Sequence, residues 1–306
     1  MNPAVKPTAE GAPERTRAFR AIAAFTLLEL LVVITILGIL AALTVPVLKN
    51  LGKSSVQLSA SRQLLDDLAR ARQLAISQRT TVYMVFVPTN FFGVDGNLMT
   101  TLGNLVDPAA RLKALITATN LVPLQLTGYN FIALGQVGDQ PGQHQWRYLD
   151  DWKSLPDGTF IPPQKFSFNG YSLLIPQWQT DFGNQIDQYW RGNNQQQIYS
   201  FTNRLFPFPT ADVTSQFTYL PYVAFDYQGR LISEVSANGI YHHAYIPLAL
   251  GTVSYGRDAR KRPLPTPVSS SDITENPPGN STNLSYNVID INPQTGRASL
   301  HSFQMK

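Results

Sequence analysis

The chain contains no cysteine among its 306 residues. Disulfide bonds, thiolate metal ligands and cysteine nucleophiles are therefore excluded. Histidine is also rare, and two of its four copies, His242 and His243, are neighbours that would point to opposite faces of a strand. No Glu-x-x-His motif, Gly-x-Ser-x-Gly elbow or phosphate-binding glycine loop is present. These absences predict no metal site, no cofactor and no catalytic residue, so we expect a protein that is not an enzyme.

Charged residues are scarce, at 14% of the chain against about 25% in typical soluble domains. The formal net charge is +4, and half of it lies in residues 1–24, where four basic residues accompany two acidic ones. The remaining residues, with 20 basic and 18 acidic side chains, are close to neutral. A nucleic-acid-binding protein would carry a basic stripe, so the composition predicts no nucleic-acid partner.

One long apolar run occupies residues 25–48. As a helix it would measure about 36 Å, enough to cross a hydrocarbon core of about 30 Å. Arg15, Arg17 and Arg20 precede the run, so the positive-inside rule keeps the N-terminus in the cytoplasm and sends the following residues outward. A single carboxylate, Glu29, lies near the start of the run. Because a charge inside a membrane span is costly, we expect Glu29 to have a function there.

Three interpretations of the run are open at this point. It could be a cleaved signal peptide, whose small-residue cleavage site should follow the apolar region, as Ala41 and Ala42 loosely do. It could be a plain signal anchor in which Glu29 is incidental. In the third interpretation, Glu29 pairs with a group on another subunit of an assembly.

The third interpretation has a family resemblance behind it. Residues 24–34, Ala-Phe-Thr-Leu-Leu-Glu-Leu-Leu-Val-Val-Ile, resemble the N-terminal motif of type IV pilins and type II secretion pseudopilins. The resemblance implies that a prepilin peptidase cuts between Ala24 and Phe25 on the cytoplasmic side and methylates the new amino terminus of Phe25. It also implies that Glu29 pairs with the Phe25 amine of a neighbouring subunit during assembly. The two residues are four apart, on the same helix face.

Two further positions match the same family, which commonly has glycine and proline where this chain has Gly38 and Pro46. Gly38, with Ala41 and Ala42, would let another helix approach closely. Pro46 lacks a backbone donor and disfavours helix at Val45, which predicts a kink or local melting there.

The pattern turns amphipathic over residues 49–79. Apolar side chains recur every three or four positions, which is typical of one helix face. The residues of this stripe are Val56, Ala60, Leu64, Leu68, Ala71 and Ala75. Residues 65–79 resemble a segment of GspH/FimT-type minor pseudopilins in which an Ala-Arg pair precedes Ala-Ile and a strand follows the helix. Residues 80–87, rich in β-branched and aromatic side chains, fit that strand.

The C-terminal part predicts strands joined by Gly-Arg turns. One strand–turn–strand segment covers residues 222–233 and a second covers 286–300. The presence of two such segments near the C-terminus is similar to the sheet of the GspH/FimT family. Gly229 and Gly296 are expected in turns that need a positive φ angle. Between these two segments, the basic stretch 257–262 begins a predicted mobile loop that runs to Asn280. We expect the charge of this stretch to be solvated.

Residues 91–221 contain many Asn, Gln, Pro and aromatic residues, and we interpret most of this region as an insertion. Its four tryptophans are Trp146, Trp152, Trp178 and Trp190. Aromatics interleaved with Asn and Gln could form a carbohydrate-stacking surface, or they could simply cover a small core. The first possibility leaves an alternative function open, that of a membrane-anchored extracytoplasmic adhesion or glycan-binding protein.

The expected fold class is α+β. A cytoplasmic leader (1–24) is followed by the transmembrane half (25–48) and the amphipathic half (49–79) of one long helix. That helix packs on an antiparallel β-sheet domain (80–306) with a large loop-rich insertion (91–221). The expected function is that of a minor subunit of a type IV pilus or type II secretion pseudopilus, with a single pass through the bacterial inner membrane and a periplasmic C-terminal domain. The expected partners are a prepilin peptidase, other pilin or pseudopilin subunits and inner-membrane lipid.

Overall fold

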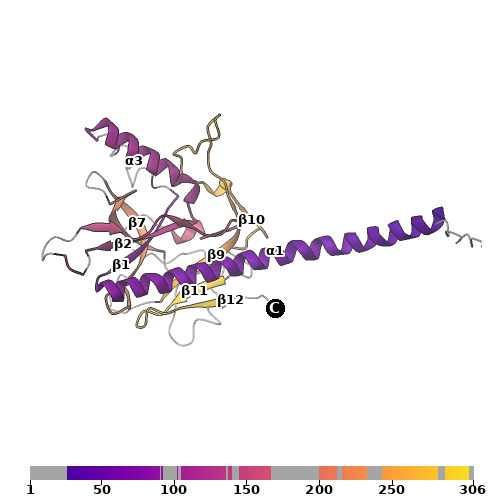
Figure 1. Ribbon diagram of the computed structural model, residues 1–306, viewed down its shortest axis with the longest axis horizontal. Helices are drawn as coiled ribbons and strands as arrows, with labels where there is room; N and C mark the ends of the chain where they lie inside the picture. The colour runs from indigo at the N-terminus through magenta and orange to yellow at the C-terminus, as the bar shows by residue number, and fades with distance from the viewer. Residues whose placement is uncertain are drawn as a thin grey trace, which may run out of the picture. The chain divides into compact units, whose positions relative to one another are not determined.

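The computed structural model describes residues 26–89, 91, 102, 105–135, 137–139, 145–166, 200–211, 216–232, 243–281 and 287–302. Side chains are not described for residues 42–54, 216, 270 and 302. The chain divides into two compact units, Met1–Asn50 and Leu51–Lys306. Helices occur together with antiparallel sheets, so the predicted α+β class is confirmed (Figure 1).

The longest element is helix α1, Leu27–Gln78, which is unbroken over 52 residues. Of the kink or local melting predicted near Pro46, the local melting is corrected, because residues 45 and 46 both lie inside the helix, and the kink stays a prediction. A proline removes only one helical hydrogen bond, and the turns on either side continue the helix. No helix within the part of the chain that the structure describes combines the length and the hydropathy of a membrane span.

The second unit contains a seven-stranded antiparallel sheet in the order β3-β2-β1-β7-β6, with β4 paired to β2 and β8 paired to β7. Its strands are β1 Val82–Phe86, β2 Gly128–Leu134, β3 Trp146–Tyr148, β4 Lys153–Ser154, β6 Thr202–Phe208, β7 Gln216–Phe225 and β8 Leu231–Ile232. Strand β1 lies between β2 and β7, and all five of its residues are buried. The predicted strand directly after α1 is thus central to the sheet.

A five-stranded sheet has the order β10-β9-β11-β12, with β5 paired to β9. Its strands are β5 Thr159–Phe160, β9 Ala244–Val253, β10 Ile273–Glu275, β11 Asn287–Ile291 and β12 Ala298–Ser302. The remaining elements are helix α3, Pro108–Asn120, and the short 3-10 helices η1 Val122–Leu124, η2 Pro163–Lys165 and η3 Ser270–Asp272. The second Gly-Arg turn joins β11 to β12, and its strands pair from Asn287↔Ser302 to Ile291↔Ala298.

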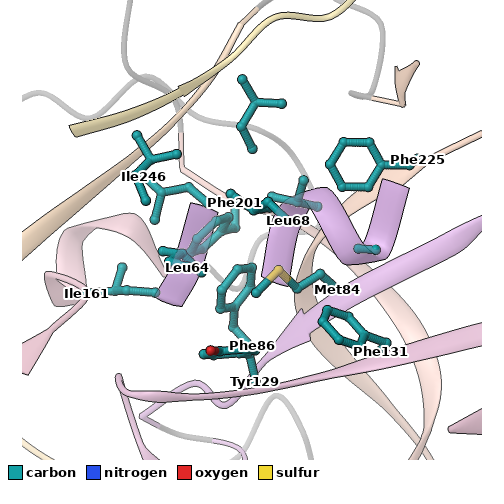
Figure 2. Close-up of a cluster of buried hydrophobic side chains, with 14 of the residues drawn as sticks. Leu64, Leu68, Met84, Phe86, Tyr129, Phe131, Ile161, Phe201, Phe225 and Ile246 are labelled. Atoms are coloured by element: carbon teal, nitrogen blue, oxygen red, sulfur yellow. The ribbon is translucent and has the colours of Figure 1, made fainter. Parts of the chain in front are cut away.

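The main core lies between the second half of α1 and both sheets (Figures 1 and 2). Five of the six residues of the amphipathic stripe are fully buried, namely Ala60, Leu64, Leu68, Ala71 and Ala75. Figure 2 places Leu64 and Leu68 beside Phe86 of the seven-stranded sheet and Ile246 of the five-stranded sheet. Full burial of a leucine side chain contributes about 1.5–3 kcal/mol to the free energy of folding, so this stripe supplies a large part of the energy that holds α1 against the sheets.

The other face of the seven-stranded sheet has its own core. Tyr83 and Val85 alternate with Val82, Met84 and Phe86 along β1, so that the two sets fall in different clusters. The second cluster also includes residues of α3 and η1. Asp107 is the N-cap of helix α3, and its carboxylate accepts a hydrogen bond from the Ala109 backbone nitrogen at 3.0 Å. A sheet covered on both faces explains why β1 shows a continuous apolar run.

The predicted loop-rich insertion is corrected in its described parts. The interval 91–221 contributes α3, the strands β2 to β6 and the start of β7. Strand β2 pairs with β1 over five residues, from Phe86↔Tyr129 to Val82↔Ala133, and therefore belongs to the sheet itself. Short strands separated by proline and glycine show little periodicity in the sequence, and for this reason the pattern predicted loops.

Candidate functional site

The first part of α1 presents a continuous apolar surface. Between Leu27 and Leu40, eleven large hydrophobic side chains are exposed, by 40% at Val33 up to 82% at Leu27. Isolated exposed apolar residues are ordinary, but a contiguous surface of this kind marks an interaction site with a membrane or a partner. This segment is the candidate site for anchoring and assembly.

Glu29 lies in the first turn of α1, next to the helix N-terminus. The Glu29 backbone nitrogen donates to Thr26 Oγ1 at 3.2 Å, and the Leu30 nitrogen donates to the Thr26 carbonyl at 3.1 Å. Thr26 therefore caps the helix, and the positive end of the helix dipole favours a carboxylate at this position. The sequence pattern Thr-x-x-Glu, from Thr26 to Glu29, is a capping signal that indicates this helix start.

The other predicted site residues can be placed only in part. Ala24 and Phe25, the residues on either side of the predicted cut, lie outside the described residues. Gly38 is inside α1, and a Cβ atom added to it would meet nothing within 4 Å, so that face of the helix is open to a neighbour. Pro46 is inside α1, but its side chain lies outside the described residues.

A polar network joins the second half of α1 to β2 and β4. The Tyr129 hydroxyl donates to Asp67 Oδ2 at 2.6 Å, and Lys153 Nζ contacts Asp67 Oδ1 at 2.7 Å. Gln63 Nε2 donates both to the Tyr129 hydroxyl and to the Ser154 carbonyl, each at 2.8 Å. Burial and the hydrogen bond to Asp67 raise the pKa of Tyr129. Because Asp67 is buried, its partners are needed to offset desolvation, and they fix the register of the helix on the sheet.

The same network ends at Asp150, which contacts Lys153 Nζ at 3.1 Å and Arg70 at 2.9 Å. Partial burial pushes the pKa of Asp150 up, but the hydrogen bond from Lys153 and the nearby positive charges outweigh it and hold that pKa below its usual value. Burial likewise lowers the pKa of Lys153, but the hydrogen bonds to Asp67 and Asp150 outweigh it and raise that pKa. The folded state therefore favours the charged form of both partners.

This predicts a pH-dependent contribution to stability from Asp150. A carboxyl with a depressed folded pKa stabilises the fold above its unfolded pKa of about 3.9 and loses this effect as the pH falls through the folded pKa. The unfolding free energy of the detergent-solubilised wild type should exceed that of Asp150→Asn near neutral pH, and the difference should vanish in acid. Asp151→Asn, an exposed neighbour outside these ion pairs, is the control. A difference between wild type and Asp150→Asn that stays constant with pH would contradict the assignment.

Arg72 of α1 connects the two Gly-Arg turns. Its Nε donates to the Gly229 carbonyl at 3.0 Å and to the Thr295 carbonyl at 2.9 Å. The turns also bond directly, because the Leu231 backbone nitrogen donates to the Pro293 carbonyl at 3.1 Å. One side chain therefore ties the helix to a turn from each sheet. The signal in the sequence was an arginine four residues after Leu68, beside the apolar stripe.

Both turn glycines have positive φ angles, 77° at Gly229 and 61° at Gly296, as predicted. Gly296 is also a site of close approach, since a Cβ atom there would lie 2.0 Å from the Gly229 carbonyl oxygen. In the first turn, Arg230 Nε contacts Asp226 Oδ2 at 2.8 Å. Hence the turn glycines have a packing role in addition to a conformational one.

The described tryptophans of the interval 91–221 take part in packing. Trp146 contacts Tyr83 and Phe206 with ring centroids 5.7 and 5.3 Å apart. Trp152 contacts Phe208 at 5.8 Å. These rings support the covering role considered for the aromatic residues, whereas Trp178 and Trp190 lie outside the described residues.

Among the residues with described positions, no group of three or more His, Asp or Glu side chains could hold a metal ion. His243 Nδ1 instead contacts Asp290 Oδ1 at 2.6 Å, on the five-stranded sheet. His242 and His144 lie outside the described residues.

Comparison with known proteins gives one family match. Residues 19–45 match the family described as the prokaryotic N-terminal methylation motif. The matched residues include the predicted cleavage junction, Glu29 and Gly38. No curated protein and no solved structure matches the chain. The chain thus carries a prepilin-type methylation motif, which supports a pilin-like or pseudopilin-like protein, while the GspH/FimT subtype stays a prediction.

Proposed function

We propose that this protein, which carries the prepilin-type methylation motif, is a minor subunit of a type IV pilus or a type II secretion pseudopilus. A prepilin peptidase removes residues 1–24, and the subunit is held in the bacterial inner membrane by its N-terminal helix until assembly. The observation that carries the proposal is the exposed apolar surface from Leu27 to Leu40, which lies within the matched motif.

Glu29 has a defined role in this proposal. Cleavage after Ala24 would leave a cationic amine on Phe25, and Glu29 of an adjacent subunit would pair with it. A carboxylate among apolar residues needs such a partner, because desolvation without one is costly. The exposed apolar side chains around Glu29 supply the low-dielectric environment once subunits pack together, which strengthens the pair.

The size of the second unit favours a minor subunit over the major repeating one. Residues 51–306 form a compact unit, and a bulky body obstructs the tight packing of many identical helices. A rare subunit tolerates such a body more easily. Arg72 and the two Gly-Arg turns, which carry the resemblance to GspH/FimT-type proteins, form one connected structure and support the same proposal.

Processing can be tested by co-expressing the chain with a prepilin peptidase. We expect loss of residues 1–24 in the wild type and no loss in Ala24→Leu, since the resemblance implies a junction with a small residue. Ala23→Leu, one position earlier, is the matched control and should be cut normally. Equal resistance of both variants, or no cleavage of the wild type, would argue for a plain signal anchor.

A further inference from the structure

The basic stretch 257–262, here called the cationic turn, is a hydrogen-bonded structure. Residues Arg257 and Pro263 form an antiparallel bridge. Inside it, the Asp258 backbone nitrogen donates to the Arg262 carbonyl at 2.9 Å, and the Lys261 nitrogen donates to the Asp258 carbonyl at 2.8 Å. The prediction of a mobile loop from 257 to Asn280 is thereby corrected, since the same interval also contains η3 and β10.

The only acidic residue of the cationic turn is used internally. Asp258 Oδ1 accepts hydrogen bonds from the backbone nitrogens of Arg260 and Arg262, at 2.9 and 2.8 Å. Asp258 Oδ2 contacts Arg262 Nε at 2.8 Å. These bonds, led by the Arg262 backbone nitrogen, lower the pKa of Asp258. The carboxylate therefore shapes the turn and pairs with one of its four cations.

The cations at the tip point into solvent. Arg260 and Lys261 are exposed, and neither forms an ion pair with another described residue. Lys261 has a φ angle of 63°, a left-handed conformation that is unfavourable for most residues with a Cβ atom. Arg257 lies over the Tyr255 ring, with its Cζ atom 4.6 Å from the centroid. The tip thus presents two exposed cations at adjacent positions of a hydrogen-bonded turn, and an anionic partner would lower the repulsion between them.

The base of the cationic turn is fixed to the core of the second unit. Gln125, which is fully buried, donates from Nε2 to the Thr266 carbonyl at 3.2 Å and accepts from the Val268 nitrogen at 2.9 Å. Pro263, Pro265 and Pro267 restrict the backbone between tip and base. Leu264, next to the turn, exposes 38% of its surface. The result is a short projection with a basic tip and an adjacent apolar side chain.

We propose that the cationic turn binds the phosphate headgroups of anionic phospholipids. A local basic tip with a neighbouring apolar side chain suits a headgroup layer, where each nearby cation adds to the attraction. Nucleic acid is less favoured, because it is bound by a longer basic stripe and the chain beyond residue 24 is nearly neutral overall. This inference rests on the proposed function, in which the apolar helix holds the protein at a membrane.

The absence of cysteine allows a direct test with the full chain. Ala259→Cys would give a unique label at the tip of the turn. The labelled chain is reconstituted in vesicles of phosphatidylcholine alone or mixed with phosphatidylglycerol, and quenching by spin-labelled headgroups is measured after flotation. We expect quenching in the mixed vesicles only, with loss of the signal at 1 M salt, where the Debye length is about 3 Å.

In the labelled background, Arg260→Gln/Lys261→Gln should reduce the contact equilibrium by about 25-fold, or about fivefold for each cation removed near an anionic surface. The matched control is Arg62→Gln/Arg297→Gln, which removes two exposed cations elsewhere and should quench normally. Flotation without quenching, or quenching unaffected by the double variant, would overturn the lipid contact alone. Failure of the chain to float would instead remove the membrane attachment on which both proposals depend.

Discussion

Glu29→Gln is expected to leave membrane attachment intact and to reduce assembly by about 100-fold or more. Removing one partner of a buried ion pair costs about 3–5 kcal/mol, because the other charge stays behind without compensation. Glutamine keeps the shape of the side chain, and the substitution retains the hydrogen bond that the backbone nitrogen of residue 29 donates to Thr26 Oγ1. The measurement is recovery of the subunit with sheared filaments or with sibling subunits, normalised to the membrane fraction.

The matched control for Glu29→Gln is Thr35→Val. Thr35 is a second polar residue in the same apolar surface, and its hydroxyl donates within the helix to the Leu31 carbonyl at 2.7 Å. Its replacement should leave assembly close to the wild-type level. Glu29→Asp, which keeps the charge on a shorter side chain, should fall between wild type and Glu29→Gln. Normal assembly of Glu29→Gln would mean that the carboxylate is incidental and that the helix is a plain anchor.

Gly296→Ala is expected to destabilise the second unit by about 3 kcal/mol or more. A left-handed conformation costs an L residue about 1–2 kcal/mol, and the added methyl group overpacks a filled site at a further cost of about 1–3 kcal/mol. The new Cβ atom would lie 2.0 Å from the Gly229 carbonyl oxygen, a backbone atom that no rotamer change can move. Arg72 bonds to that same carbonyl, so displacing the turn also weakens the connection to α1.

Gly138→Ala provides the comparison for this prediction. Gly138 also has a positive φ angle, 97°, but an added Cβ atom would meet nothing within 4 Å. Gly138→Ala should therefore lower the free energy of unfolding only by the cost of the left-handed conformation. Denaturant unfolding of the detergent-solubilised full chain measures both variants. Equal destabilisation by the two substitutions would show that close packing of the turns contributes nothing.

Local patterns in the sequence were sufficient for several elements. The spacing of Leu64, Leu68 and Ala71 predicted a buried helix face, since a 3.6-residue period is directly visible in a sequence. The β-branched and aromatic residues after α1 predicted β1. Gly229 and Gly296 were expected in turns because few other residues accept a positive φ angle.

Long-range contacts could not be predicted in this way. Arg72 is 157 residues from Gly229 and 223 from Thr295, and nothing local indicates that these three residues meet. The contacts of Asp67 with Tyr129 and Lys153 likewise depend on the pairing of β2 with β4. Such contacts arise only when the whole sheet has formed.

The central claim is most directly tested by the mass of the N-terminal peptide of the protein isolated from its native membranes. The account predicts that the mature chain begins at Phe25 and that its amino group carries a methyl group. Glu29 would then lie four residues from a cationic terminus, as assembly requires. A chain that retains Met1 and residues 1–24 intact would contradict the account.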